Sequence, residues 1–175
     1  MSGVVAPVLV GLMGSGKSSI GRRLARALEL ELIDLDEYIV DKAGMSIPAI
    51  FAAEGEEAFR DRETAALREV LGRPAVIATG GGAVMREENR QLLKAHPPVI
   101  WLKASPKFLA RRIKGDSNRP LIAGGDVRKR LRALAKIRHP LYKECADFIL
   151  PRADMSKDEA MVAILEFLAN WPKRG

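Results

Sequence analysis

The most informative part of this sequence is the run Val8-Leu9-Val10-Gly11-Leu12-Met13-Gly14-Ser15-Gly16-Lys17-Ser18. Its last eight residues match G-x-x-x-x-G-K-S, a turn whose backbone N–H groups surround phosphate oxygens. The apolar run before the turn predicts a strand, and the periodic segment Lys17–Leu28 predicts a helix after it. The positive end of that helix would face the same anion. A chance match in a glycine-rich turn is the alternative, and the flanking elements argue against it. We therefore expect bound ATP or GTP.

The residues of this loop have separate chemical tasks. Lys17 can reach the β- and γ-phosphates, and the hydroxyl of Ser18 can ligate Mg²⁺. The residues expected to contact the nucleotide in this part of the chain are Gly14, Ser15, Gly16, Lys17, Ser18 and Ser19.

Short apolar runs alternate with helical patterns along the chain, which favours an α/β fold with a parallel sheet covered on both faces. The expected strands are residues 8–10, 30–33, 76–78, 99–102 and 148–150, and the expected helices are 17–28, 56–71, 87–95 and one with its N-cap at Ser156. We expect a single domain over residues 1–175. Two segments interrupt the alternation: residues 36–62, helical without a strand, and residues 114–125, rich in Gly and Pro. Such insertions often carry specificity and lids.

Positive charge is concentrated in one segment. Between Arg111 and Arg138 there are ten Lys and Arg residues against Asp116 and Asp126, an excess of eight that accounts for the whole net charge of +7. A nucleic-acid interface, a solvated helix face and a pocket for a small anion are the three interpretations, and the rest of the sequence favours the pocket. The solvated face suits Arg128, Lys129, Arg130 and Arg132. The single cysteine, Cys145, excludes an intrachain disulfide and a thiolate-rich metal site.

Two carboxylates follow the second expected strand, in Ile33-Asp34-Leu35-Asp36. Ligands bind at the carboxyl edge of open parallel sheets. We therefore expect both carboxylates to lie at that edge, next to the phosphate loop. The third strand carries no acid at its end and runs into Gly80-Gly81-Gly82. The guanine-reading motif Asn-Lys-x-Asp is absent from the sequence, which argues against a signalling GTPase.

With these features in place, the sequence resembles the shikimate kinase family over nearly its whole length. The resemblance is carried by residues 11–18, Asp34-Leu35-Asp36, Ile50-Phe51, Gly55-Glu56, Phe59-Arg60, Glu63, Gly80-Gly81-Gly82-Ala83-Val84, Arg119-Pro120-Leu121 and Arg138-His139-Pro140-Leu141-Tyr142. It implies a P-loop kinase of the nucleoside-monophosphate-kinase type: a three-layer α/β/α fold with five parallel strands in the order 2-3-1-4-5. The implied enzyme is an ATP-dependent phosphotransferase with an alcohol acceptor, the 3-hydroxyl of shikimate. Residues 36–62 would be the substrate-binding insertion and 114–125 the lid.

The resemblance also implies a role for each matching residue. Asp36 would act on the acceptor hydroxyl, Asp34 would hold Mg²⁺ together with Ser18, and Glu63 would orient Arg60. The substrate carboxylate would be bound by Arg60 and Arg138, whose planar guanidinium groups suit carboxylates. Gly81 and Gly82 would lie beneath the substrate ring, with Phe51, Phe59 and Leu121 as apolar walls. Arg119 would reach the transferring phosphate from the lid, and Arg112 would stack on adenine. Lys17, Asp36 and Arg119 are the expected catalytic residues.

Several alternatives stay open. Asp34 and Asp36 could cap a helix, and Phe51 and Phe59 could be ordinary core. Gluconate kinase shares this type of fold and loop, and a regulatory nucleotide- or nucleic-acid-binding module is the alternative without catalysis. The expected ligands are ATP, shikimate and Mg²⁺, with no nucleic acid and no membrane. We expect a cytoplasmic monomer.

Overall fold

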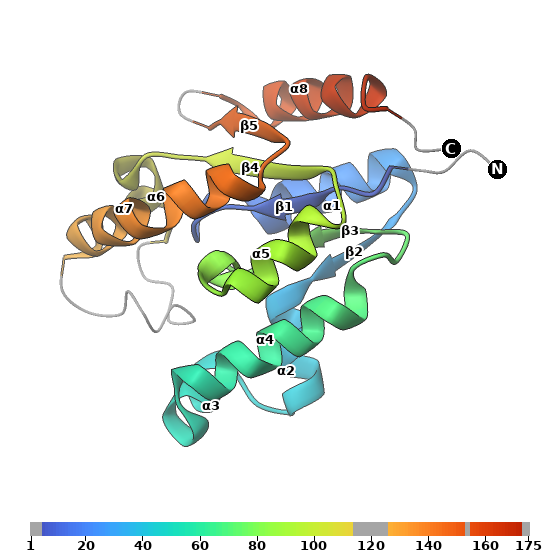
Figure 1. Cartoon of the computed structure of the whole chain (residues 1–175). Helices are drawn as coiled ribbons and strands as arrows, with labels where there is room; N and C mark the ends of the chain where they lie inside the picture. Colours follow the sequence, from blue (N-terminus) through green and yellow to red (C-terminus); the bar gives the residue numbers. More distant parts are fainter. Residues whose placement is uncertain (1–4, 114–125, 153–154, 173–175) are drawn as a thin grey trace.

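The five predicted strands form one parallel sheet in the order β2-β3-β1-β4-β5 (Figure 1). The structure is a computed structural model that describes residues 5–113, 126–152 and 155–172. The strands are β1 (Val8–Val10), β2 (Glu31–Asp34), β3 (Ala75–Ala78), β4 (Val99–Lys103) and β5 (Phe148–Pro151). Each differs from its predicted range by at most one residue at either end. Both the fold class and the strand order are confirmed.

Helices connect the strands and cover the sheet. They are α1 (Lys17–Leu28), α2 (Leu35–Ala43), α3 (Ile47–Glu54), α4 (Glu56–Val70), α5 (Glu87–Lys94), α6 (Pro106–Ile113), α7 (Val127–Cys145) and α8 (Lys157–Ala169), with a 3-10 turn η1 (Ala83–Met85) after β3. Ser156 caps α8 as predicted, since its side chain accepts from the Glu159 N–H while the Glu159 carboxylate accepts from the Ser156 N–H.

The core lies on both faces of the sheet, which creates the three layers. Neighbouring residues of a strand point to opposite faces. In β1, Val8 and Val10 therefore pack with Leu67 of α4 and other residues of the helices on one face. Leu9 packs instead with Leu24 of α1 and other residues of α1 and α8 on the other face.

The segment 36–62 is helical without a strand, as predicted. Figure 1 shows α2 and α3 at the end of the molecule opposite α8. The predicted boundary at residue 62 falls inside α4, and this has a physical reason. Beyond residue 62 the same helix carries Ala66, Leu67 and Val70 into the core, so one rigid element serves both the insertion and the sheet.

The predicted lid, residues 114–125, lies outside the described residues, and so do Arg119 and Leu121 within it. The side chain of Arg112 also lies outside the described part. In the described part of the chain, we find no helix whose length and apolar character would let it cross a membrane.

Candidate active site

The loop between β1 and α1 turns sharply at glycine positions. Gly14 and Gly16 have φ angles of 82° and 97°, a left-handed conformation that side-chain-bearing residues rarely adopt. Gly16 is the N-cap of α1, and the first turn of the helix reads Lys-Ser-Ser-Ile, with no acid to compete for an anion. The positive end of α1 therefore faces the loop, as an anion site requires.

Lys17 is nearly buried, with 8% of its surface exposed. Its Nζ donates to the carbonyl oxygens of Gly11 at 2.5 Å and Leu12 at 3.0 Å. These bonds hold the ammonium group over the loop, at the place where phosphates would enter.

Asp34 carries out two tasks at once, because a carboxylate has two oxygen atoms. Its Oδ1 accepts from the Glu37 N–H at 3.2 Å and so caps α2, which was the alternative considered for this residue. Its Oδ2 accepts from the Ser18 hydroxyl at 2.5 Å. Capping therefore does not conflict with the predicted role beside Ser18.

A cavity of about 680 Å³ joins the loop to the two acids. It is lined by residues of the loop, of α1, of the end of β2, of α2, of the start of α3 and the connection before it, and of the turn after β3: Gly14, Gly16, Lys17, Ser18, Ser19, Arg22, Asp34, Asp36, Glu37, Val40, Asp41, Ser46, Ile47, Thr79, Gly80 and Gly81. The ends of β1, β2 and β3 thus meet at one edge of the sheet, as the sequence predicts.

The turn Gly80-Gly81-Gly82 contacts the main polar groups directly. A Cβ atom on Gly80 would lie 2.7 Å from Oδ1 of Asp36 and 3.2 Å from Oε2 of Glu63. On Gly82 it would lie 2.7 Å from Cζ of Arg60. A side chain at Gly80 or Gly82 would therefore have to displace the Asp36 carboxylate or the Arg60 guanidinium group.

Arg60 and Arg138 contact this turn at Gly82 and Gly81, and they line a second cavity of about 420 Å³. Only 7% of Arg60 and 3% of Arg138 is exposed. Arg60 donates to Glu63 Oε1 at 2.8 Å, so the predicted orienting contact is present in the structure. Burial raises the pKa of Glu63 to about 7, against the opposing effect of Arg60. Burial likewise lowers the pKa of Arg138.

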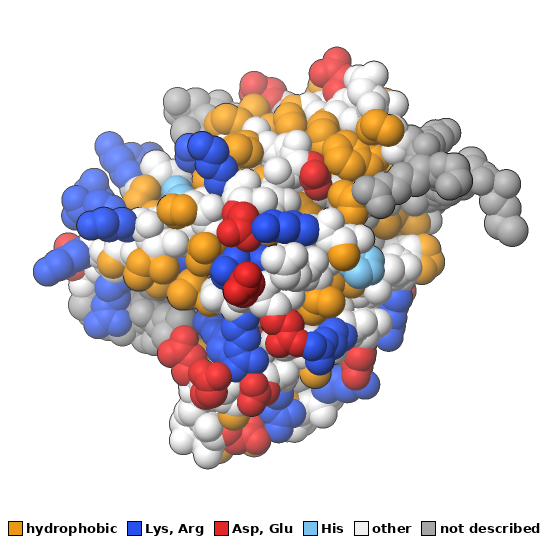
Figure 2. Space-filling view, viewed as in Figure 1, with side chains coloured by type: hydrophobic (Ala, Val, Ile, Leu, Met, Phe, Trp, Pro, Cys, Tyr) orange, Lys and Arg blue, Asp and Glu red, His pale blue; other side chains and the backbone are white. Residues whose placement is uncertain are grey.

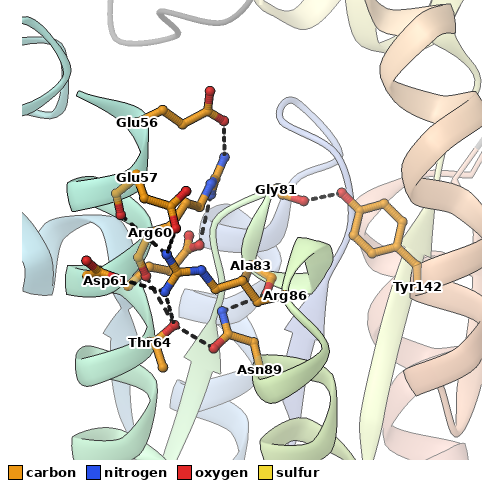
Figure 3. A network of polar contacts seen from close by, with 11 residues as sticks. Glu56, Glu57, Arg60, Asp61, Thr64, Gly81, Ala83, Arg86, Asn89 and Tyr142 are labelled. Carbon is orange, nitrogen blue, oxygen red and sulfur yellow. Dashed lines mark hydrogen bonds and ion pairs between the residues drawn. The ribbon is translucent and has the colours of Figure 1, made fainter.

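A polar network fixes the helix that carries Arg60 (Figure 3). Thr64 of α4 bonds to the Arg60 carbonyl and to Asn89, and Asn89 donates to the Ala83 carbonyl directly after the glycine turn. Arg86 forms ion pairs with Glu57 and Asp61 from the solvent side. The network connects α4 to η1 and α5, so Arg60 and the glycine turn are held by the same framework.

The structure tests one of the two roles considered for the phenylalanines, that of ordinary core residues. Phe59 is 4% exposed and belongs to the core, while Phe51 is half-buried with its ring centre 5.0 Å from that of Phe59. The Arg60 guanidinium lies 5.2 Å from the centre of the Phe59 ring. Their function as walls of the substrate site stays a prediction.

The basic residues of α7 fall into two groups, exposed and buried, as the sequence suggested. Figure 2 shows Lys and Arg side chains gathered on the side of the molecule where α7 lies. The exposed residues of α7 include Arg128, Lys129, Arg130 and Arg132, whereas Arg138 on the same helix is buried. The helix therefore has a solvated basic face, while its Arg138 side chain is buried inside the protein.

Two further residues of the site were not assigned a role from the sequence. Arg152 is 2% exposed and donates to the carbonyl oxygen of Ser15 at 3.4 Å, behind the phosphate loop. Tyr142 is fully buried and donates to the carbonyl oxygen of Gly81. Nothing in the pattern around Arg152 signals burial, whereas Tyr142 is four residues after Arg138 and therefore on the same helix face.

Fold and site together define a P-loop kinase that acts on a small molecule. The family model "Shikimate kinase" matches residues 13–169. A shikimate kinase from Cupriavidus pinatubonensis is 51% identical over 142 residues, which cover 81% of this chain and 74% of that protein. The chain belongs to the shikimate kinase family.

Solved structures agree with this assignment. The shikimate kinase from Acinetobacter baumannii in complex with shikimate has a TM-score of 0.92 and 39% identity, and the match covers 96% of this chain and 94% of that one. A gluconokinase from Sinorhizobium meliloti has a TM-score of 0.59 and 19% identity, over 95% of this chain and 92% of that one. At that identity the second likeness shows the fold alone.

Proposed function

We propose that this chain transfers the γ-phosphoryl group of ATP to the 3-hydroxyl group of shikimate. The observation that carries the proposal is that one glycine turn contacts both groups of residues. Gly80 and Gly81 line the cavity of the phosphate loop and Asp36, while the buried Arg60 and Arg138 lie against Gly82 and Gly81. A substrate with a carboxylate at one end and a reactive hydroxyl at the other fits this arrangement.

Each of these residues then has a separate role in the reaction. Arg60 and Arg138 bind the carboxylate and so orient the ring, which places one hydroxyl group near Asp36. Asp36 accepts a hydrogen bond from this hydroxyl and draws off its proton as the oxygen attacks phosphorus. Lys17 exchanges its carbonyl partners for phosphate oxygens and stabilises the charge that moves during transfer. These assignments, like those of Ser15, Ser19, Gly81 and Gly82, are proposals.

Ser18 and Asp34 fit the Mg²⁺ ion that such a reaction uses. Both supply hard oxygen atoms, which Mg²⁺ prefers, and both line the cavity at the phosphate loop. No group of three or more His, Cys, Asp or Glu that could hold a metal occurs among the described residues, so phosphates and water would supply the other ligands. Bound there, the ion would neutralise charge on the β- and γ-phosphates.

Removal of divalent metal ions tests the proposed Mg²⁺ site. Chelation of divalent cations should stop turnover, and added Mg²⁺ should restore it. Ser18→Ala should raise the Mg²⁺ concentration needed for half-maximal rate by roughly tenfold, because one oxygen ligand is lost. An unchanged Mg²⁺ requirement in a folded Ser18→Ala protein would remove Ser18 from the metal site.

A substrate panel tests the reaction itself. ADP release is followed with shikimate, gluconate, nucleoside monophosphates or water as acceptor, and the phosphorylated position is read by NMR. We expect the highest kcat/KM with shikimate. Gluconate is the second candidate because its kinase shares the fold and the type of substrate. A preference for gluconate or a nucleotide would overturn the proposal.

The two arginines provide a sharper test of how the acceptor binds. Arg60→Ala and Arg138→Ala should each weaken shikimate binding by roughly 2–5 kcal/mol, the scale for leaving a buried charge without its partner. ATP binding should change little. Arg132→Ala, on the exposed face of the same helix as Arg138, is the matched control and should behave like the wild type. Equal losses for ATP and shikimate would show general damage instead.

The monomeric state, the cytoplasmic location and the absence of a nucleic-acid ligand stay predictions from the sequence. The first is measured by size-exclusion chromatography with light scattering, where a dimer would contradict it.

A further inference from the structure

The hydroxyl group of Tyr142 is buried between two parts of the proposed acceptor site. Tyr142 has no exposed surface, and its Oη donates to the carbonyl oxygen of Gly81 at 2.5 Å. Figure 3 shows this bond reaching the glycine turn from α7, apart from the contacts made by α4. The guanidinium group of Arg138, one helical turn earlier, is near enough that its charge opposes the rise in pKa that burial gives Tyr142. The proton of the Tyr142 hydroxyl is therefore directed at the Gly81 carbonyl.

The bond to Gly81 also fixes its neighbour. The Gly81 carbonyl and the Gly82 N–H belong to one planar trans peptide and point in opposite directions. The N–H of Gly82 is thereby aimed away from Tyr142. The two arginines pack against this peptide, since a Cβ on Gly81 would lie 3.2 Å from Nη1 of Arg138, and one on Gly82 would lie 2.7 Å from Cζ of Arg60.

The tyrosine ring itself has a fixed position. Its centre lies 5.6 Å from that of Trp101, a residue of β4 that is 3% exposed. Tyr142 belongs to the core cluster, so the ring cannot swing away from the turn without disturbing close packing. Arg138, in contrast, has a long side chain whose Nε has no hydrogen-bond partner among the described residues. Arg138 therefore depends on its packing against the glycine turn, which the Tyr142 hydroxyl holds.

We propose that Tyr142 is a positioning residue for the acceptor substrate: its hydroxyl holds the Gly81–Gly82 peptide, against which the Arg138 guanidinium packs, in one arrangement before the acceptor binds. The role rests on the proposed function, which assigns Arg138 and the glycine turn to shikimate. An arginine that is already ordered loses less conformational entropy when a carboxylate binds, so the hydroxyl raises affinity without touching the ligand.

Tyr142→Phe tests the role by removing one oxygen atom and keeping the ring. We expect the KM for shikimate to rise about tenfold, the scale of one buried hydrogen bond, and the KM for ATP to change less than about twofold. The matched control is Tyr38→Phe, the other tyrosine, whose hydroxyl bonds to Glu69 outside the site. Both KM values should stay at wild-type levels in the control.

The outcomes separate the two proposals. A wild-type protein that does not phosphorylate shikimate contradicts the proposed function. A wild-type protein that does, together with a Tyr142→Phe variant of unchanged shikimate KM, overturns the positioning role. An equal rise in both KM values overturns it as well, because a purely structural loosening has no preference for the acceptor.

A double-mutant cycle tests the link to Arg138. Tyr142→Phe and Arg138→Lys should each weaken shikimate binding by some factor. If the hydroxyl acts through Arg138, the double variant should bind shikimate more tightly than the product of these two factors predicts. Independent, multiplying factors would overturn the link. All assays are made at a temperature where circular dichroism shows folded protein. Should the Phe variant not fold, 4-aminophenylalanine at position 142 keeps a donor to Gly81 on the same ring. Its shikimate KM should stay within about twofold of the wild-type value, and a rise of about tenfold would overturn the role.

Discussion

Lys17→Met should lower kcat by roughly 10²–10⁴-fold, because phosphoryl transfer is catalysed mainly by positioning and by stabilisation of charge. Lys17 is the one residue of the phosphate loop that brings a full positive charge to the cavity. Methionine has a similar length and an apolar stem, so the packing of this nearly buried side chain is kept. The substitution therefore removes the positive charge and keeps the fold.

The measurement is single-turnover and steady-state kinetics with saturating ATP and shikimate. The thermal midpoint of the variant should stay within a few degrees of the wild type, which shows that the loss is chemical. Lys136→Met, at an exposed position of α7, is the matched control. A Lys17→Met protein with near-normal kcat would place Lys17 outside the reacting site.

Asp36→Asn is the second large effect we expect, a fall in kcat of about 10²–10⁴-fold at nearly unchanged ATP affinity. The carboxylate of Asp36 lies against the Gly80 Cα, next to Glu63. Asparagine keeps the shape and loses the charge, so it can no longer take the proton of the acceptor hydroxyl. Position and packing stay the same, and only the proton acceptor is lost.

Asp41→Asn provides the control, because Asp41 is on the same helix and lines the same cavity. We expect this variant to retain the wild-type kcat. ATP affinity is measured separately by titration with a non-hydrolysable analogue. If Asp36→Asn turns over normally, or if it loses ATP binding in parallel, the assignment of Asp36 to the acceptor hydroxyl is wrong.

The sequence predicted the parts of the site that depend on local pattern. The phosphate loop follows from residues 11–18, and parallel strands must bring their carboxyl ends to one edge. That rule was enough to place Asp34 and Asp36 beside Lys17, as the structure does. The contact of Glu63 with Arg60 was predicted from the family resemblance, and both lie on one face of α4.

Contacts between distant segments could not be predicted in the same way. The bond between Tyr142 and Gly81 joins residues 61 positions apart, and the bond between Arg152 and Ser15 joins residues 137 apart. Periodicity shows which residues of a helix share a face, but it does not show which loop that face meets. Burial of Arg152 is likewise a property of the assembled fold, since an arginine after a strand is exposed in most sequences.

The packing of Tyr142 on Trp101 gives this protein a natural optical probe. The chain has two tryptophans, Trp101 in β4 and Trp171 after α8. Trp101 lies behind the tyrosine that holds the glycine turn, whereas Trp171 packs on Phe167, away from that turn. With Trp171 replaced by phenylalanine, intrinsic fluorescence would come from a single indole in contact with the acceptor half of the site. Its emission would report the packing around Tyr142, without a label and without turnover.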